Sequence, residues 1–376
     1  INTMMRMERY RGHFYNWYDT ISLVPLYPKY ISTVDSGNMS AHLITLKQGL
    51  QAIPDDKIIT ECFFKGLIDT VGILLEYTKQ NELLLKFRDD LKENYKNRID
   101  TLSEIKDYLE ELANSYTRIL IELDMDPDEP DDIWSQKLLQ QIIEQKNTIL
   151  TLAPWLVFLE VPPKFNELIP ELPSVPTLRQ IALIEQILLQ KIISFYTDEN
   201  SEIENDWLTN FRSSITEAAR RAKELIITIE QLVIKCISLA DIDYDFLFDR
   251  SQNLLAIGYN VEEHRCDNSY YDLLASEARL TTYTGIAQGK LPQESWFALG
   301  RQLTNQGSAP ILLSWSGSMF EYLMPLLVMP SYDNTLLDQT YKAVVQKQID
   351  YGKRRSVPWG ISESGFNMVD AHLNYQ

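Results

Sequence analysis

The chain has 376 residues, of which 45% are hydrophobic and 11% aromatic. This length and composition suit one large domain or two domains with a sizeable core, and they exclude an intrinsically disordered chain. The formal net charge of −18 would repel phosphate backbones, so nucleic acid is excluded as an expected partner.

Features of the whole chain indicate its cellular setting. The three cysteines are widely spaced and do not form a disulfide framework, which favours reduced thiols in the cytoplasm. No apolar stretch has the length of a transmembrane helix, and no signal peptide opens the chain. The first residue is Ile1 rather than Met, and the last residues carry no helix stop signal. We therefore expect a truncated piece of a longer protein.

The first predicted elements are helices. Residues 39–50 carry Leu43, Leu46 and Leu50 on one face of a helix that should end near Gly49. Residues 61–93 have the spacing of one long helix or two short ones.

Capping boxes mark three later helix starts, each with Ser or Thr followed three residues on by Glu or Gln. The pairs are Thr101 with Glu104, Thr177 with Gln180, and Ser201 with Glu204. We predict a loop at 124–132 and an extended Pro-rich segment at 161–176. In the last of these helices an apolar stripe is formed by Leu225, Ile229, Leu232, Val233 and Cys236.

The region 101–240 therefore reads as a helical bundle whose spacing shows no catalytic pattern. From residue 241 onward, loops rich in Ser, Gly and Trp interrupt the helices, and strand signals are few. The expected fold class is mostly α.

Four segments carry residue types suited to binding sugars. The first comprises 9–20 (RYRGHFYNWYDT) and 30–38 (YISTVDSGN). Aromatic rings offer flat platforms to sugar rings, and carboxylates and amides grip hydroxyls, which makes Trp17, Tyr18, Asp19, Asp35 and Asn38 candidates. The alternative is a buried aromatic cluster in which Asp35 or Asn38 caps a helix.

The second segment, 267–280 (DNSYYDLLASEARL), contains Glu277. A helix capped by Asp267 or Ser269 would place Glu277 near an apolar stripe. Desolvation there raises a carboxyl pKa, as a general acid needs. The alternative is an ion pair with Arg279 or Arg250.

The last two segments each contain a Trp and a Glu. In 312–325 (LLSWSGSMFEYLMP), Trp315 and Glu321 are binding candidates. Glu321 is also a rival catalytic carboxylate, and the alternative is a charge that holds a loop. In 357–367 (VPWGISESGFN), Glu363 lies among Ser and Gly residues near Trp359, which is a further binding candidate. Hydroxyl donors would stabilise its ionised form, as a nucleophile requires, and the alternative is a solvated loop.

Other chemistries lack their motifs. The four histidines, His13, His42, His264 and His372, show no metal-binding spacing. No phosphate-binding loop and no nucleophile elbow are present. We expect neither a metal nor a cofactor.

Taken in order, these segments resemble the glycoamylase-like region of cyclic β-1,2-glucan synthases. The resemblance covers roughly 1–50 and 241–376. It implies an (α/α)6-type barrel, incomplete at its C-terminus, with its first part at 1–100, an inserted helical bundle at 101–240 and a continuation at 241–376.

The resemblance also implies a function. In the family this region closes a linear β-1,2-glucan chain into a ring by transglycosylation with retention of configuration. It implies Glu277 as the acid/base and Glu363 as the nucleophile, with the glucan chain and a membrane-embedded glucosyltransferase region of the same polypeptide as partners. The parent protein would lie in the bacterial inner membrane with this region on the cytoplasmic side. The alternatives are an endo-β-1,2-glucanase on the same barrel and an inactive truncated glucan-binding module.

Overall fold

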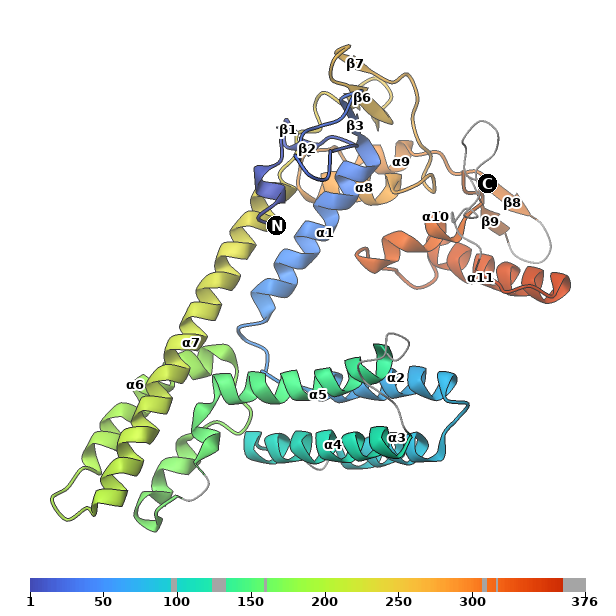
Figure 1. Ribbon diagram of the computed structural model, residues 1–376. Helices are drawn as coiled ribbons and strands as arrows, with labels where there is room; N and C mark the ends of the chain where they lie inside the picture. The colour runs from blue at the N-terminus through green and yellow to red at the C-terminus, as the bar shows by residue number, and fades with distance from the viewer. Residues whose placement is uncertain (96–99, 124–132, 159–160, 306–309, 316, 361–376) are drawn as a thin grey trace. The chain divides into compact units, whose positions relative to one another are not determined.

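The computed structural model describes residues 1–95, 100–123, 133–158, 161–305, 310–315 and 317–360 (Figure 1). Within them the protein is mostly helical, as predicted, with small sheets. The chain divides into two compact units, one made of 1–49 and 232–376 and the other of 50–231. Among the described residues, no helix is both long enough and apolar enough to cross a bilayer.

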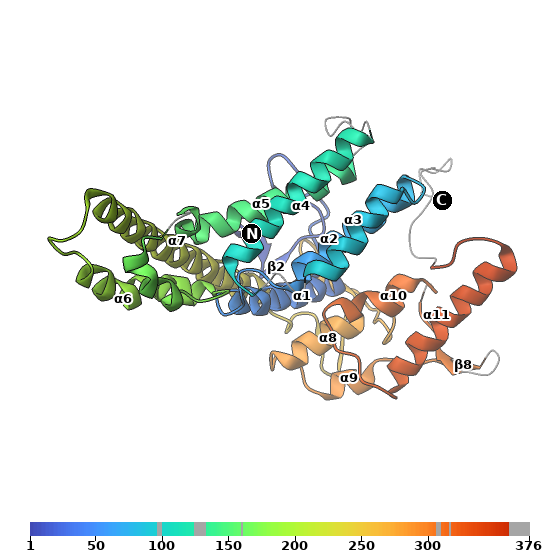
Figure 2. The ribbon, with the colours of Figure 1, turned by 90° about the horizontal axis from the view of Figure 1, so that it is seen from below.

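The unit at 50–231 is built around four helices: α2 (Glu61–Tyr77), α3 (Glu82–Asn94), α4 (Leu102–Glu122) and α5 (Ile133–Leu152). Each of them packs against two of the others, in the order α2, α3, α4, α5 and back to α2. Figure 2 shows the four helices side by side. Their facing sides bury one continuous apolar core that includes Phe64, Leu109 and Ile142.

The rest of this unit follows the same helical pattern. It contains α6 (Leu178–Ser194) and the first part of the long helix α7 (Glu202–Ala240). Short 3-10 helices lie at Pro154–Val157 and Pro163–Glu171. The prediction of an extended segment at 161–176 is therefore wrong for its central part, where successive 3-10 turns continue past the prolines. The predicted loop at 124–132 lies outside the described residues.

All three predicted capping boxes are confirmed. The hydroxyl of Thr101 accepts from the backbone N–H of Glu104, while the Glu104 carboxylate accepts from the N–H of Thr101. The same reciprocal pair forms at Thr177 with Gln180 and at Ser201 with Glu204. Each box satisfies N–H groups that a helix start leaves unpaired.

The other unit begins with a 3-10 helix at Met4–Arg6 and the hairpin β1 (Arg9–Tyr10) and β2 (His13–Phe14). A three-stranded antiparallel sheet then joins β3 (Tyr30–Ser32), β6 (Gly258–Asn260) and β7 (Arg265–Cys266). Its register pairs Tyr30 with Asn260, so segments more than 200 residues apart in sequence become neighbours.

Helices and two further hairpins complete this unit. The helices are α1 (Thr33–Ala52), α8 (Ala278–Ala287), α9 (Glu294–Ala298), α10 (Met319–Leu323), a 3-10 helix at Met324–Leu327 and α11 (Leu336–Arg355). The hairpins are β4 (Phe248–Asp249) with β5 (Leu254–Leu255), and β8 (Leu303–Asn305) with β9 (Pro310–Leu312). Helix α1 begins six residues before the predicted segment, because Ser32 caps it by accepting from the N–H of Asp35 at 3.3 Å.

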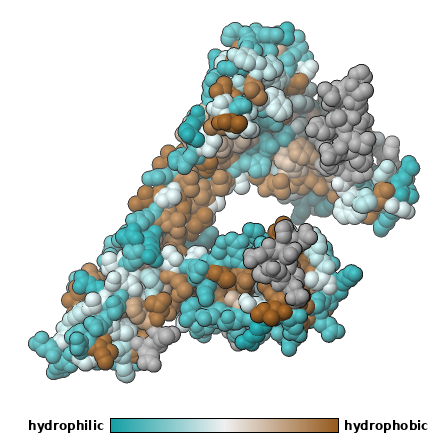
Figure 3. All heavy atoms as spheres, viewed as in Figure 1, coloured by the Kyte–Doolittle hydropathy of each residue, from teal (hydrophilic) through white to brown (hydrophobic). Residues whose placement is uncertain are grey.

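The surface of α7 is not uniformly polar. Figure 3 shows apolar side chains gathered along α7 and α1 on the face in view. Ile234 and Ile237 are at least half exposed, while Ile229 and Cys236 are buried. Leu225, a member of the predicted apolar stripe, is 41% exposed. The stripe is thus buried only in part.

Candidate active site

The N-terminal turns of α1 and α8 meet closely, and this contact creates the candidate site. A Cβ atom at Gly37 would lie 2.1 Å from the Thr281 hydroxyl oxygen, so only a glycine fits. That hydroxyl donates to the Val34 carbonyl at 3.3 Å. The close approach brings the next residue, Asn38, to Glu277, where its side-chain nitrogen donates to Oε1 at 3.2 Å.

The backbone around Glu277 differs from the prediction. A helix starting at Asp267 or Ser269 and running through Glu277 is wrong, because α8 begins only at Ala278. The Asp272 carboxylate accepts from the N–H groups of Leu274 and Ala275, both at 2.8 Å, and forms a turn instead. Ser276 then adopts a left-handed backbone with φ of 46°.

Glu277 is nevertheless buried, with 5% of its surface exposed, as the sequence predicted. Its Oε2 accepts a hydrogen bond from the Ser276 hydroxyl. Burial disfavours the charged carboxylate, whereas amide and hydroxyl donors favour it. Glu277 is thus a buried carboxyl group that accepts from one amide donor and one hydroxyl donor.

A second predicted carboxylate, Glu321, lies beside the first. Glu321 is 3% exposed, and its Oε1 accepts from the backbone N–H of Ser276 at 3.3 Å. It sits in the first turn of α10, which Ser318 caps by accepting from the N–H of Glu321 at 3.4 Å. Two glutamates that are far apart in sequence therefore both accept hydrogen bonds from Ser276, Glu321 from its backbone N–H and Glu277 from its hydroxyl.

Tyrosines extend the cluster toward two more predicted residues. The pKa of Tyr271 is raised by burial and further by the charges of Asp35, Glu277 and Asp267. Its ring meets Trp315 edge to face, with centroids 6.1 Å apart. Asp35 and Trp315 thus belong to the surroundings of Tyr271, as does Glu277.

Tyr30 and Asp267 form the neighbouring pair. The Tyr30 hydroxyl donates to the Asp267 carboxylate. The pKa of Tyr30 is raised, first by burial and then by this hydrogen bond. Asp267 was expected only as a helix cap, and Tyr30, Tyr271 and Ser276 were not predicted as site residues. The adjacent tyrosines in YISTVDSGN and DNSYYDLL were the available signal.

Of the remaining predicted residues, Trp17 and Asp19 lie near the N-terminus, Trp359 lies at the end of the described chain and Glu363 lies outside it. Trp17, which is 64% exposed, and Asp35 line a cavity of about 360 Å³. Asp19 closes its own turn by accepting from the N–H of Ser22 at 2.6 Å, which lowers its pKa. Trp359 is exposed beside Gly352. Glu363 lies outside the described residues.

Arg279 and Arg250, the two candidate ion-pair partners of Glu277, bind other groups. Both terminal nitrogens of the Arg279 guanidinium donate to backbone carbonyls of α10. Arg250 pairs with Asp245 at 3.7 Å. Within the described residues, no group of three or more His, Cys, Asp or Glu side chains is arranged to hold a metal ion.

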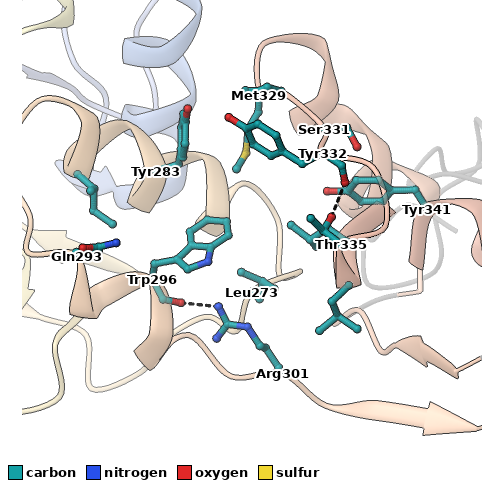
Figure 4. A pocket seen from close by; sticks show the side chains of 14 residues that line it. Leu273, Tyr283, Gln293, Trp296, Arg301, Met329, Ser331, Tyr332, Thr335 and Tyr341 are labelled. Atoms are coloured by element: carbon teal, nitrogen blue, oxygen red, sulfur yellow. Dashed lines mark hydrogen bonds between the residues drawn. The ribbon is translucent and has the colours of Figure 1, made fainter. Parts of the chain in front are cut away.

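A separate cavity of about 430 Å³ has a different chemistry (Figure 4). It is lined mainly by apolar and aromatic groups, among them Leu273, Trp296 and Tyr332. Two of its polar side chains make internal hydrogen bonds. Arg301 donates to the Trp296 carbonyl at 2.7 Å, and Thr335 donates to the Tyr332 carbonyl at 2.8 Å. The cavity is therefore less suited to binding sugar hydroxyls than the group of side chains around Glu277 and Glu321.

Comparison with known proteins places this site in context. No family model matches the chain. The chain is 32% identical over 388 aligned residues to the cyclic β-(1,2)-glucan synthase NdvB of Rhizobium meliloti (strain 1021). The match includes the whole of this chain and 12% of the length of that protein. The chain is thus homologous, over its full length, to a region of a cyclic β-(1,2)-glucan synthase, and homology to a glucan synthase indicates a region of a carbohydrate-active enzyme.

Proposed function

We propose that this chain is the cyclizing region of a cyclic β-1,2-glucan synthase and acts as a retaining transglycosylase on linear β-1,2-glucan. The observation that carries the proposal is that a region homologous to such a synthase holds a buried glutamate, Glu277, between an amide and a hydroxyl donor. The proposal includes an (α/α)6-type barrel, with 101–240 inserted between its parts at 1–100 and 241–376.

In the proposed mechanism two carboxyl groups act on the same glycosidic bond. Glu363 attacks the anomeric carbon while Glu277 protonates the departing oxygen, which leaves a covalent glucosyl intermediate. Glu277 then removes the proton from a hydroxyl at the other end of the same glucan, and that oxygen displaces Glu363. Retention requires the two carboxyls to stand about 5 to 5.5 Å apart.

Binding of a neutral sugar suits the groups near Glu277. The Asn38 amide, the Asp35 and Asp267 carboxylates and the Tyr271 hydroxyl can exchange hydrogen bonds with glucan hydroxyls. The Trp315 ring offers an apolar face for a sugar ring. We also propose that the glucan is delivered by a membrane-embedded glucosyltransferase region of the same polypeptide, in the bacterial inner membrane, with this region on the cytoplasmic side.

The test uses the full-length synthase and linear β-1,2-glucan, with products analysed by mass spectrometry. We expect products that lack one water relative to linear chains of the same length. Glu277→Gln should lower the rate by about 10²- to 10⁴-fold, the usual contribution of general acid–base catalysis. The exposed Glu262→Gln serves as the matched control and should leave the rate unchanged. If all products are linear chains shorter than the substrate, cyclization is rejected and the enzyme is a hydrolase.

A further inference from the structure

Arg279 is a buried cation in an unfavourable place. It is fully buried and lies two residues after Glu277, in the first turn of α8. The amino end of a helix carries partial positive charge, so a cation there is disfavoured. Burial also lowers the pKa of Arg279, although a guanidinium stays protonated in proteins. Specific contacts must therefore hold this side chain in place.

These contacts join α8 to α10. Nη1 of Arg279 donates to the Glu321 carbonyl at 2.6 Å, and Nη2 donates to the Tyr322 carbonyl at 2.6 Å. The guanidinium also lies 5.8 Å from the ring centroid of Tyr341, which lines the cavity in Figure 4. Charge-assisted hydrogen bonds of this length are stronger than neutral ones. The planar fork of an arginine fixes both carbonyls at once.

A second set of contacts returns from α10 to the turn that precedes α8. The Glu321 carboxylate accepts from the N–H of Ser276, and the Ser276 hydroxyl donates to Glu277. Ser276 has the left-handed backbone of a strained residue, which persists only where neighbouring contacts hold it. The contacts form a closed circuit from Arg279 through Glu321 and Ser276 to Glu277, and the chain from 277 to 279 completes it.

We propose that Arg279 is a positioning residue for Glu277, which it aligns through Glu321 and Ser276. In this arrangement Glu321 holds the backbone that presents Glu277. The inference rests on the proposed function, in which Glu277 protonates the departing oxygen. Loss of the Arg279 contacts would leave the glucan bound but would misalign Glu277, the proton donor.

The test compares two substrates of the full-length synthase. Cleavage of linear β-1,2-glucan requires a proton on the departing sugar oxygen. The dinitrophenyl glycoside of a short β-1,2-glucan instead releases dinitrophenolate, a leaving group that needs no proton. Arg279→Lys keeps the charge and loses the fork. We expect kcat on the glucan to fall by about 100-fold, the effect of a misplacement of about 1 Å, with KM unchanged. On the dinitrophenyl glycoside, the initial burst of dinitrophenolate reports formation of the covalent intermediate alone. This burst should keep the rate of the unmodified protein, because Glu277 is needed as a base only in the later step.

Arg301→Lys is the matched control. Arg301 makes the same kind of paired contact, to the carbonyls of Leu299 at 2.6 Å and Trp296 at 2.7 Å, but holds the end of α9. This variant should retain kcat on the glucan and the burst rate on the dinitrophenyl glycoside. If Arg279→Lys lowers kcat on the glucan and the burst rate on the dinitrophenyl glycoside equally, Arg279 supports the fold alone and the proposal is overturned.

Two further variants keep the inference testable and separate it from the proposed function. If Arg279→Lys does not fold, Glu321→Ala tests the same circuit of contacts, and it should lose activity on the glucan but not the burst rate on the dinitrophenyl glycoside. Glu321→Gln is its conservative counterpart, because the amide oxygen still accepts from the N–H of Ser276. An equal loss on both substrates in Glu321→Ala again overturns the inference. Glu277→Gln gives the reference pattern. If it lacks the difference between substrates, the assignment of Glu277 as the acid fails instead.

Discussion

His13 shows how one buried side chain makes stability depend on pH. It is 1% exposed, and the Nε2 of its neutral ring donates to the Asp243 carbonyl at 2.7 Å. Burial lowers the pKa of His13 from 6.5 to about 4, and the charge of Lys290 acts in the same direction. The hydrogen bond to the Asp243 carbonyl and the charge of Asp243 raise this pKa, but they do not outweigh burial. Because the unfolded chain takes up the proton first, the stability from neutral His13 is complete above pH 6.5 and declines as pH falls toward 4.

The expected loss can be measured by urea unfolding. Between pH 7.5 and 5.0, His13 should reduce the free energy of unfolding by about 2 kcal/mol. His13→Gln should remove this part of the pH dependence, whatever its effect at neutral pH. His264→Asn, at an exposed turn, is the control and should leave the slope as it is. A slope that persists in His13→Gln would refute the assignment.

At the scale of elements, the junction of α1 and α8 decides whether Asn38 reaches Glu277. Gly37→Ala would place a methyl group 2.1 Å from a hydroxyl that is itself buried. Overpacking of this kind costs about 1 to 3 kcal/mol and forces the helices apart. We expect a lower free energy of unfolding and a lower kcat on β-1,2-glucan.

Gly49→Ala provides the control within the same helix. Its added methyl group would meet no atom within 4 Å. Replacing glycine by alanine in an exposed helix stabilises by up to about 1 kcal/mol. Opposite signs for the two substitutions, measured by chemical unfolding, would support the close junction. A neutral Gly37→Ala would contradict it.

The elements differ in how far the sequence could predict them. Capping boxes are local, because the donor and the acceptor lie three residues apart, and all three were confirmed. The turn before Glu277 depends on Asp272 and on Glu321, which contacts the chain from 45 residues away. A helical pattern at 267–277 could not reveal that competition. The 3-10 turns at Pro163–Glu171 were missed because prolines were taken as breaks.

The sequence indicated single residues of the candidate site, but it did not indicate the contacts between them. Burial of Glu277 followed from the apolar residues around it. Its contact with Asn38 depends on Gly37, whose role becomes visible only when α8 lies against it. Arg279 was considered only as an ion-pair partner, although its hydrogen bonds go to backbone carbonyls. Those carbonyls belong to a helix about 40 residues further along the chain.

At the scale of the whole molecule, the two compact units predict two unfolding transitions. The unit at 50–231 buries one continuous apolar core among its helices. The other unit has smaller clusters of its own, one of them around Leu273 and Leu312. Units with separate cores can unfold at separate stabilities.

Substitutions confined to one unit should therefore move one transition. Thr101→Ala removes the cap of α4 and should lower the stability of the 50–231 unit by about 1 kcal/mol. Thr117→Ala, on the same helix, removes only a bond to the Ala113 carbonyl and is the control. Gly37→Ala should move the other transition alone. Hydrogen exchange read by mass spectrometry assigns each transition to its peptides. A single transition displaced by both substitutions would mean that the two units unfold as one, because a shared equilibrium responds to a change in either core.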